Sequence, residues 1–299
     1  MFSFSSRKKQ TAAIEDTIER HGKWAEVWKR LKKNKVAMAS LVLLVIILLS
    51  TIFANVLAPY SFSEVNIANR FQYPSAEHLL GTDNYGRDIL TRIMYGGRIS
   101  LLVSLLAIAM STVVGGFLGA TAAYFGGRYE NIVMRCLDVL MAIPAFLLAI
   151  SISAALGSGV FNSAIALSVA GIPSSARLMR ATVLGVKDQE YVEAARANGV
   201  RTGGIILRHI IPNCFTPVLV DCTLRIGSNI LQISSLSFIG LGVQPPTPEW
   251  GSILAAGRDY IRDFWPIVVF PGIAIMLTLI AFNLLGDGLR DAMDPRLKR

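Results

Sequence analysis

Long apolar runs, mostly uncharged, alternate with short polar segments along the chain. Six runs stand out, and each has about the 20 residues that a helix needs to cross about 30 Å of hydrocarbon. The runs cover residues 36–57, 99–125, 132–155, 160–179, 214–241 and 264–285. The pattern predicts an all-α, polytopic membrane protein with six transmembrane helices.

The polar segments divide the chain into parts. Residues 1–35 form a polar N-terminal tail, followed by the first transmembrane helix at 36–57, a predicted outer loop at 58–98 and a five-helix core at 99–299. Residues 15–35 of the tail predict an amphipathic helix on the membrane surface, with an apolar side of Ile18, Trp24, Val27, Trp28 and Leu31. The core contains an inner loop at 180–213, a proline-rich outer loop at 242–263 and a charged C-terminal tail.

Charge sets the orientation of these segments. Only 16% of the residues are charged, against about 25% in soluble domains. The net charge of +9 reflects lysines and arginines that fall mainly in alternate segments, 21 in the predicted inner segments against six in the outer ones. Because basic residues collect on the cytoplasmic side, both termini and the 180–213 loop are predicted to lie inside. This distribution also argues against nucleic-acid binding.

The sequence offers no catalytic, cofactor-binding or metal-binding residues. Its three cysteines form no CxxC pair and are expected to be small buried hydrophobes, and its three histidines lie outside the spans. The 83–94 segment has Met94 where a calcium loop needs a bidentate Glu, which favours a glycine turn capped by Asp83. Neither a phosphate-binding Gly-x-x-x-x-Gly-Lys-Ser/Thr loop nor a Gly-x-Ser-x-Gly hydrolase motif occurs. The first apolar run, at 22 residues, is too long for a cleaved signal peptide. The chain is therefore not expected to be an enzyme.

One short segment of the inner loop has an unusual pattern. Asp188 is a predicted helix N-cap, and Gly199 stands where a C′ residue would end the helix. A face of this helix combines small and polar side chains at helical spacing, Tyr191, Ala194, Ala195 and Asn198, flanked by Glu193 and Arg196. A helix of two turns is marginal alone, so its small face must be buried against something. That partner is either its own protein or another chain.

This segment carries a resemblance to a known family. Glu193-Ala194-Ala195, followed by Gly199 and Pro212, resembles the cytoplasmic loop motif of ABC importer permease subunits. The family pattern is Glu-Ala-Ala, a glycine, and later Ile-x-Leu-Pro, and this chain departs from it at His209 and Ile211. The resemblance implies that the 188–199 helix docks into a groove on an ATPase subunit. Glu193 would make a polar contact, and Ala194, Ala195 and Gly199 would permit close approach.

Other segments narrow the resemblance to the oligopeptide, dipeptide and nickel permeases. They are Leu79-Leu-Gly-Thr-Asp-Asn-Tyr-Gly-Arg-Asp88, Ser235-Leu-Ser-Phe-Ile-Gly-Leu-Gly-Val-Gln-Pro-Pro-Thr-Pro-Glu-Trp-Gly251 and Asn283-Leu-Leu-Gly-Asp-Gly-Leu-Arg-Asp-Ala-Met-Asp-Pro295. The chain resembles the second, C-type permease subunit from about Trp28 to its C-terminus. The implied fold is that of a type I ABC importer permease in the cytoplasmic (inner) membrane of a prokaryote.

The resemblance also implies partners and a substrate class. The expected partners are a homologous permease subunit, two ATPase subunits that bind ATP and magnesium, and an extracytoplasmic substrate-binding protein. The expected cargo is a di- or oligopeptide, moved by alternating access. Nickel chelates, opines or glutathione are alternatives within the same architecture. A passive channel or a membrane scaffold is the alternative from a different class.

Polar residues inside the spans are candidates for the passage, since ionisable groups at membrane depth are costly and face protein or water. Asp221 and Arg225 are spaced i, i+4 and can pair on one face. They either lock helices together or, with Asn229 and Gln232, line the passage. Arg135 and Asp138, spaced i, i+3 in the third run, are expected to be structural.

Small residues and prolines predict two details of the helices. Gly115 and Gly119 lie on one face of the second run and should let another helix approach closely. Pro144 and Pro173 should kink the third and fourth.

Overall fold

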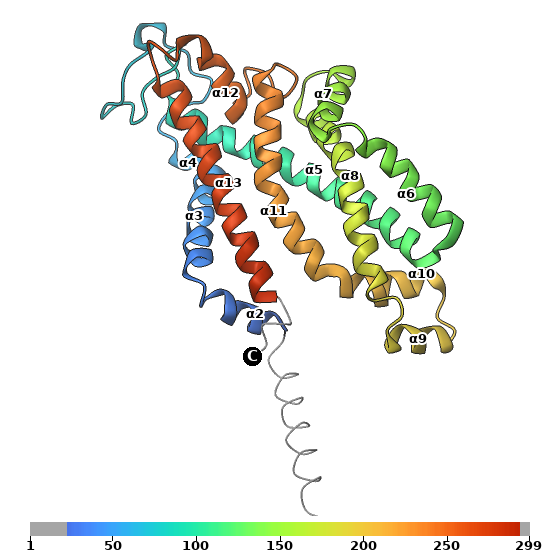
Figure 1. Cartoon of the computed structure of the whole chain (residues 1–299). Coiled ribbons are helices and arrows are strands. Elements are labelled where there is room, and N and C mark those ends of the chain that lie inside the picture. Colours follow the sequence, from blue (N-terminus) through green and yellow to red (C-terminus); the bar gives the residue numbers. More distant parts are fainter. Residues whose placement is uncertain (1–22, 294–299) are drawn as a thin grey trace, which may run out of the picture.

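The computed structural model describes residues 23–293, and every extended regular element in that range is helical (Figure 1). The α-helices are α2 Lys23–Leu31, α3 Lys35–Ile52, α4 Ala54–Leu57, α5 Ile89–Phe125, α6 Gly127–Met141, α7 Ala145–Leu156, α8 Val160–Leu184, α9 Glu190–Ala197, α10 Thr202–Gly204, α11 Ile211–Phe238, α12 Trp250–Gly257 and α13 Pro266–Met293. Two 3₁₀ turns cover Ile67–Asn69 and Arg258–Tyr260, and a π-helical segment covers Ile205–Ile210. All six apolar runs are helical, as predicted.

Two helices are longer than the hydropathy pattern predicts. α5 begins at Ile89, ten residues before the predicted span, because the Asp88 carboxylate caps it by accepting a hydrogen bond from the Thr91 amide at 2.7 Å. Its first turns carry buried polar residues such as Arg92, which pack against protein. α13 continues to Met293, well into the predicted tail. The non-helical segment before α5 therefore ends at residue 88, whereas the sequence predicted 98.

The third apolar run is two helices. α6 and α7 meet at an angle of 83° across a short break that contains Pro144. Proline has no amide hydrogen to donate and disfavours helical backbone in the residue before it, which accounts for the break. The predicted kink at Pro144 is confirmed and is stronger than a bend, whereas Pro173 lies inside a continuous α8.

Length and hydropathy identify fewer membrane-crossing helices than six among the described residues. Four qualify, namely α3, α5, the joined Thr202–Phe238 helix and α13, and the bent α6–α7 pair would be a fifth. α8 is 25 residues long, but serines and two arginines lower its hydropathy. Several of these serines are buried, because α8 lies against other helices. The count of six stays a prediction.

The most extensive helix packing joins α5 to α8. A Cβ atom added at Gly119 would lie 2.1 Å from the Ala176 carbonyl oxygen, and one added at Gly115 would lie 2.5 Å from that of Ile172. These separations are far below van der Waals contact, so only glycine permits this approach. The predicted small-residue face is confirmed, and α8 is the helix that packs on it.

The outer proline-rich loop ends in a buried cluster that fixes α12. Glu249 is completely buried, and its carboxylate accepts hydrogen bonds from Ser100 of α5 at 2.8 Å and Ser234 of α11 at 3.2 Å. The Trp250 indole donates to the Ile93 carbonyl at 2.8 Å, and its ring lies against Gly96 and Gly97. The sequence motif around Glu249 and Trp250 therefore joins three helices.

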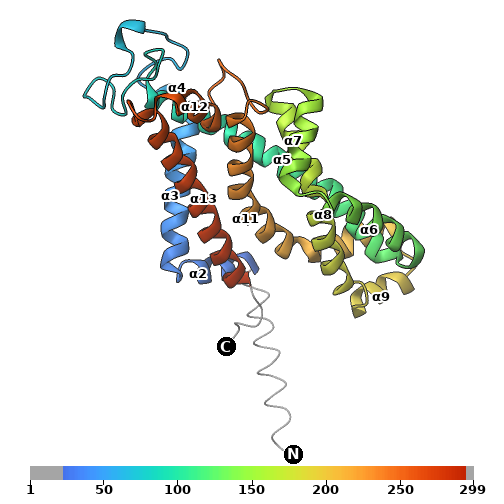
Figure 2. The ribbon, with the colours of Figure 1, turned by 45° about the horizontal axis from the view of Figure 1, so that its top comes forward.

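The predicted inner and outer segments separate to opposite ends of the molecule. α2, α9 and the C-terminal end of α13 lie at one end, whereas the 58–88 loop and α12 lie at the other (Figure 2). In α2, Leu31 is buried against Ala37 and Ala292, whereas Trp28 is 45% exposed. The first part of the predicted amphipathic helix, including Ile18, lies outside the described residues. The expectation that all three cysteines are buried is wrong for Cys136, which is exposed.

Candidate functional site

The inner loop carries α9, which is held by two side chains. Val192 is fully buried and Ala195 is 7% exposed. Val192 belongs to a cluster with Val183 at the end of α8 and with Ile205 and Ile206 after the loop. Burial of these apolar groups stabilises a helix that would be marginal alone. α9 therefore packs partly on its own protein, which was one of the two alternatives open from the sequence.

The exposed side of α9 differs from the predicted face. At 100° per residue, Glu190, Glu193, Ala194 and Ala197 lie opposite the buried pair, and all four are exposed. Tyr191 and Asn198 are exposed at the flank. The prediction that Ala195 shares one face with the exposed Ala194 is wrong, because Ala195 is buried on the same side as Val192. Sequence reasoning missed Val192 as the anchor, although it is the one large aliphatic residue in the helix.

Of the two predicted caps of α9, Gly199 at the C-terminal end is confirmed and Asp188 at the N-terminal end is wrong. The N-cap is Gln189, not Asp188, which lies one residue outside the helix. At the other end Gly199 has φ +73°, and the amides of Gly199 and Val200 donate to the carbonyls of Arg196 and Ala195, both at 3.1 Å. This pair of bonds is a Schellman motif, which needs a residue with positive φ.

Two side chains flank the exposed face of α9. The Arg196 guanidinium lies 5.8 Å from the Tyr124 ring centroid at the end of α5, a cation–π distance. Desolvation, and secondarily the nearby Cys214 thiol, raises the pKa of Tyr191 above its ordinary value. Its phenol therefore stays a neutral hydrogen-bond donor at neutral pH.

A continuous helix connects the inner loop to the middle of the molecule. α10, the π-helical segment and α11 form one helix from Thr202 to Phe238. The predicted helix start at Thr202 is confirmed. Pro212 stands in the first turn of α11, and the Asn213 side-chain amide donates to the His209 carbonyl at 2.7 Å. Residues 198–201 separate α9 from this helix, so a displacement of α9 would reach α11 through the packing of Val192 on Ile205 and Ile206.

Within α11, Arg225 joins three helices. Its guanidinium donates to Ser175 of α8 at 2.5 Å, to Ser111 of α5 at 3.2 Å and to Asp221 at 3.4 Å. It also donates to the Gly171 carbonyl at 3.4 Å. The Arg225 side chain is 17% exposed and Asp221 36%. The predicted i, i+4 pair is present, and the contacts of Arg225 are those of a link between helices.

A polar stripe runs along α11 beside Arg225. Asp221, Ser228, Gln232 and Ser235 fall within one narrow sector at helical spacing, and all are exposed or half-buried. Asn229 is buried and lies outside the stripe. Exposed polar groups on a membrane helix face water or another protein rather than lipid. The two serines were not predicted, although their spacing from Asp221 is visible in the sequence.

Replacing Arg225 with methionine should lower stability, because the hydroxyls of Ser111 and Ser175 would lose their shared donor. Loss of hydrogen bonds to a charged group costs about 1.5–3 kcal/mol each before repacking, so the apparent melting temperature should fall by several degrees. Thermal unfolding in detergent measures this, with Ser228→Ala on the exposed stripe as the control. An unchanged melting temperature for Arg225→Met would contradict the link between helices.

Ion pairs join α6 to α8 near their inner ends. Asp138 pairs with Arg177 at 2.6 Å, and Glu130 pairs with Arg180 at 2.5 Å. Arg135 is exposed. Arg135 and Asp138 thus do not form a pair of their own, because the neighbouring helix supplies a closer cation.

Within residues 23–293, no three His, Cys, Asp or Glu side chains are grouped so as to hold a metal ion. The turn at Asp83 has the predicted form instead. The Asp83 carboxylate accepts from the amides of Tyr85 at 2.8 Å and Arg87 at 3.0 Å, and Gly86 has φ +72°.

Comparison with known proteins covers nearly the whole chain. Residues 111–299 match the family described as "Binding-protein-dependent transport system inner membrane component", and residues 22–74 match "N-terminal TM domain of oligopeptide transport permease C". The chain is 43% identical to a dipeptide transport system permease protein of Alkalihalophilus pseudofirmus, over 95% of this chain and 93% of that protein. It is 42% identical to a di/tripeptide transport system permease protein of Pseudomonas aeruginosa, over 91% and 92% of the two chains.

Two further similarities are to a permease that is named for another substrate and to a solved structure with a similar fold. A glutathione transport system permease protein of Escherichia coli is 42% identical, over 92% of this chain and 91% of that protein. The inward-facing MetNI methionine ABC transporter superposes with a TM-score of 0.54, over 68% of this chain and 96% of that one, at 15% identity. At that identity the likeness concerns the fold alone.

Proposed function

The chain belongs to the family of binding-protein-dependent transport system inner membrane components, and from that premise we propose that it imports di- or oligopeptides as one half of a permease. Members of this family are membrane permease subunits of ABC transporters and not enzymes themselves. The chain is accordingly a multi-pass membrane protein with the fold of a type I ABC importer permease. We place it in the cytoplasmic membrane of a prokaryote.

One observation supports this proposal most directly, namely the form of the inner loop. α9 is anchored by Val192 and Ala195, presents small and acidic residues outward, and packs through Val192 on the start of the helix that continues into α11. A groove on an ATPase subunit would cover the exposed Ala194 and Ala197. Glu193 would meet a polar or basic group, and Gly199 would end the helix inside the groove. Asp188, Tyr191 and Arg196 would contact the rim.

The proposed partners complete the transporter. A homologous permease subunit supplies the other half of the passage, and two ATPase subunits bind ATP and magnesium. An extracytoplasmic binding protein delivers the substrate. Closure of the ATPase pair on ATP binding would carry α9 with it, swing α11 and open the passage outward, and hydrolysis would reset the cycle.

The polar stripe of α11 is the proposed wall of the passage. A small peptide has charged termini and several amide groups, which need polar partners on the way through a membrane. Asp221, Ser228, Gln232 and Ser235 offer such partners along α11, whereas Arg225 and Asn229 are held farther inside the helix bundle. A peptide substrate also agrees with the names of the two peptide transport relatives.

Glutathione is the second candidate substrate, because a relative of equal identity is named for its transport. It is a peptide of similar size with an additional carboxylate and a thiol. The two candidates differ in net charge, so substrate competition separates them.

Reconstitution of the four kinds of subunit in lipid vesicles tests the proposal. Uptake of a labelled dipeptide should require ATP, the ATPase subunits and the binding protein together. Competition by excess unlabelled dipeptide, but not by glutathione, should remove the signal. Flux through this chain without an ATPase would show a channel instead, and preferential glutathione uptake would change the substrate.

A further inference from the structure

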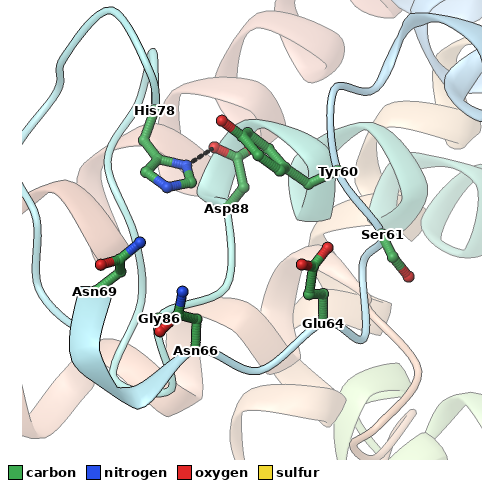
Figure 3. Close-up of a pocket in the computed structure, with 8 residues that line it drawn as sticks. All are labelled: Tyr60, Ser61, Glu64, Asn66, Asn69, His78, Gly86 and Asp88. Carbon is green, nitrogen blue, oxygen red and sulfur yellow. Dashed lines mark hydrogen bonds and ion pairs between the residues drawn. The ribbon is translucent and has the colours of Figure 1, made fainter.

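A small polar cavity lies within the 58–88 loop, at the end of the molecule opposite α9 (Figures 1 and 3). Its volume is about 60 Å³. The lining residues are Tyr60, Ser61, Glu64, Asn66, Asn69, His78, Gly86 and Asp88. One water needs roughly 10–15 Å³ on this measure, so the cavity holds about four or five groups of that size. It suits one ammonium or guanidinium group and is too small for a dipeptide.

The histidine in the cavity is fixed in one orientation by a buried carboxylate. Nδ1 of His78 lies 3.0 Å from Oδ1 of Asp88, and both residues are buried. The other carboxylate oxygen of Asp88 accepts from the Thr91 amide. Because a carboxylate only accepts, Nδ1 carries the proton, and Nε2 of the neutral ring is left with a free lone pair. Figure 3 shows this second nitrogen on the side of the cavity, pointing toward Asn69 and Asn66, with Glu64 across the cavity.

The remaining polar side chains of the cavity are also available to a ligand. The Glu64 carboxylate forms no hydrogen bond or ion pair within the described residues, and neither do the side-chain amides of Asn66 and Asn69. None of the lining residues is a lysine or an arginine, and the nearby Arg87 and Arg92 pair with Asp83 instead. The cavity therefore combines a net negative charge with hydrogen-bond acceptors, which favours a cationic donor.

Apolar side chains lie in the chain directly beside the lining residues. Val65 is 55% exposed, Ile67 58% and Tyr85 47%, on a loop that the topology places outside the bilayer. Exposed large apolar groups close to charged and polar ones are typical of a protein–protein contact, because they exclude water from the charged pair when the partner binds.

We propose that this cavity receives a lysine or arginine side chain of the extracytoplasmic substrate-binding protein. Glu64 and Nε2 of His78 would accept hydrogen bonds from the cation, and Val65, Ile67 and Tyr85 would surround it. The proposal rests on the proposed function, since it names the docking point of that partner.

The affinity of the purified binding protein for the assembled importer in lipid nanodiscs tests the proposal. Glu64→Lys should raise the dissociation constant about tenfold or more, because the attractive carboxylate is lost and the new lysine repels the incoming cation. Glu64→Gln should raise the dissociation constant less and should make it less dependent on salt concentration. The matched control is Glu77→Lys, which makes the same charge change at an exposed site of the same loop that does not line the cavity. It should stay within about twofold of the parent protein.

The outcomes separate this proposal from the proposed function. Equal effects of Glu64→Lys and Glu77→Lys, or no effect of either, would overturn the cavity as a docking point while stimulated ATP hydrolysis could remain intact. Loss of affinity on adding EDTA to the parent protein, to the level of Glu64→Lys, would show a metal site instead. If no binding protein stimulated the parent importer, the proposed function itself would fail.

Discussion

Alanine in place of Gly119 should push α5 away from α8 and destabilise the whole chain. The added Cβ would lie 2.1 Å from the Ala176 carbonyl oxygen, which is backbone and cannot rotate away. Overpacking of this kind costs about 1–3 kcal/mol or more, and the longest helix contact of the core depends on it. The apparent melting temperature in detergent should fall by roughly 5 °C or more.

A matched control lies three residues earlier on the same helix. A Cβ atom added at Gly116 would meet only the terminal methyl group of Met179, at 3.3 Å, and that side chain can move. Because alanine also favours helix over glycine by roughly 1 kcal/mol, Gly116→Ala should be neutral or stabilising. Equal melting temperatures for the two alanine variants would mean that α5 and α8 do not pack as described.

Arginine in place of Ala194 should abolish coupling to ATP hydrolysis without unfolding the protein. Ala194 is exposed on the side of α9 opposite Val192 and Ala195, so the chain itself can accommodate a long side chain there. A groove that fits alanine cannot, and we expect binding-protein-stimulated ATP hydrolysis in reconstituted vesicles to fall at least tenfold, which corresponds to about 1.4 kcal/mol. Retention of the ATPase subunits during purification should fall with it.

Two further arginine variants show whether a loss of ATP hydrolysis comes from a lost contact with the ATPase or from misfolding. Ala195→Arg should reduce the yield of folded chain, because position 195 is buried and has no room for a long charged side chain. Gly203→Arg should leave both folding and hydrolysis near the parent level, since it lies in the same loop where nothing is within 4 Å of an added Cβ. Full coupling in Ala194→Arg would argue against α9 as the contact with the ATPase.

Features that depend only on residues close together in the chain could be predicted from the sequence. Hydropathy marks a helix because every apolar run must satisfy its backbone hydrogen bonds internally in lipid. Gly199 ends α9 because a Schellman motif needs positive φ, and Gly115 and Gly119 mark a contact face because their spacing is that of one helix side. These signals are local, so no knowledge of the partner helix was needed.

Contacts between side chains of different helices could be read from the tertiary structure alone. Asp138 was assigned to Arg135 by spacing, yet α8 brings Arg177 to 2.6 Å from it. Ala195 was placed on one face with Ala194, yet it is buried beside Val192 and only Ala194 is exposed. α5 begins at Ile89, directly after its cap Asp88, because its polar first turns pack on protein, and hydropathy cannot distinguish such turns from a loop in water. Such contacts depend on the relative placement of helices far apart in sequence, and spacing along one helix carries no information about that placement.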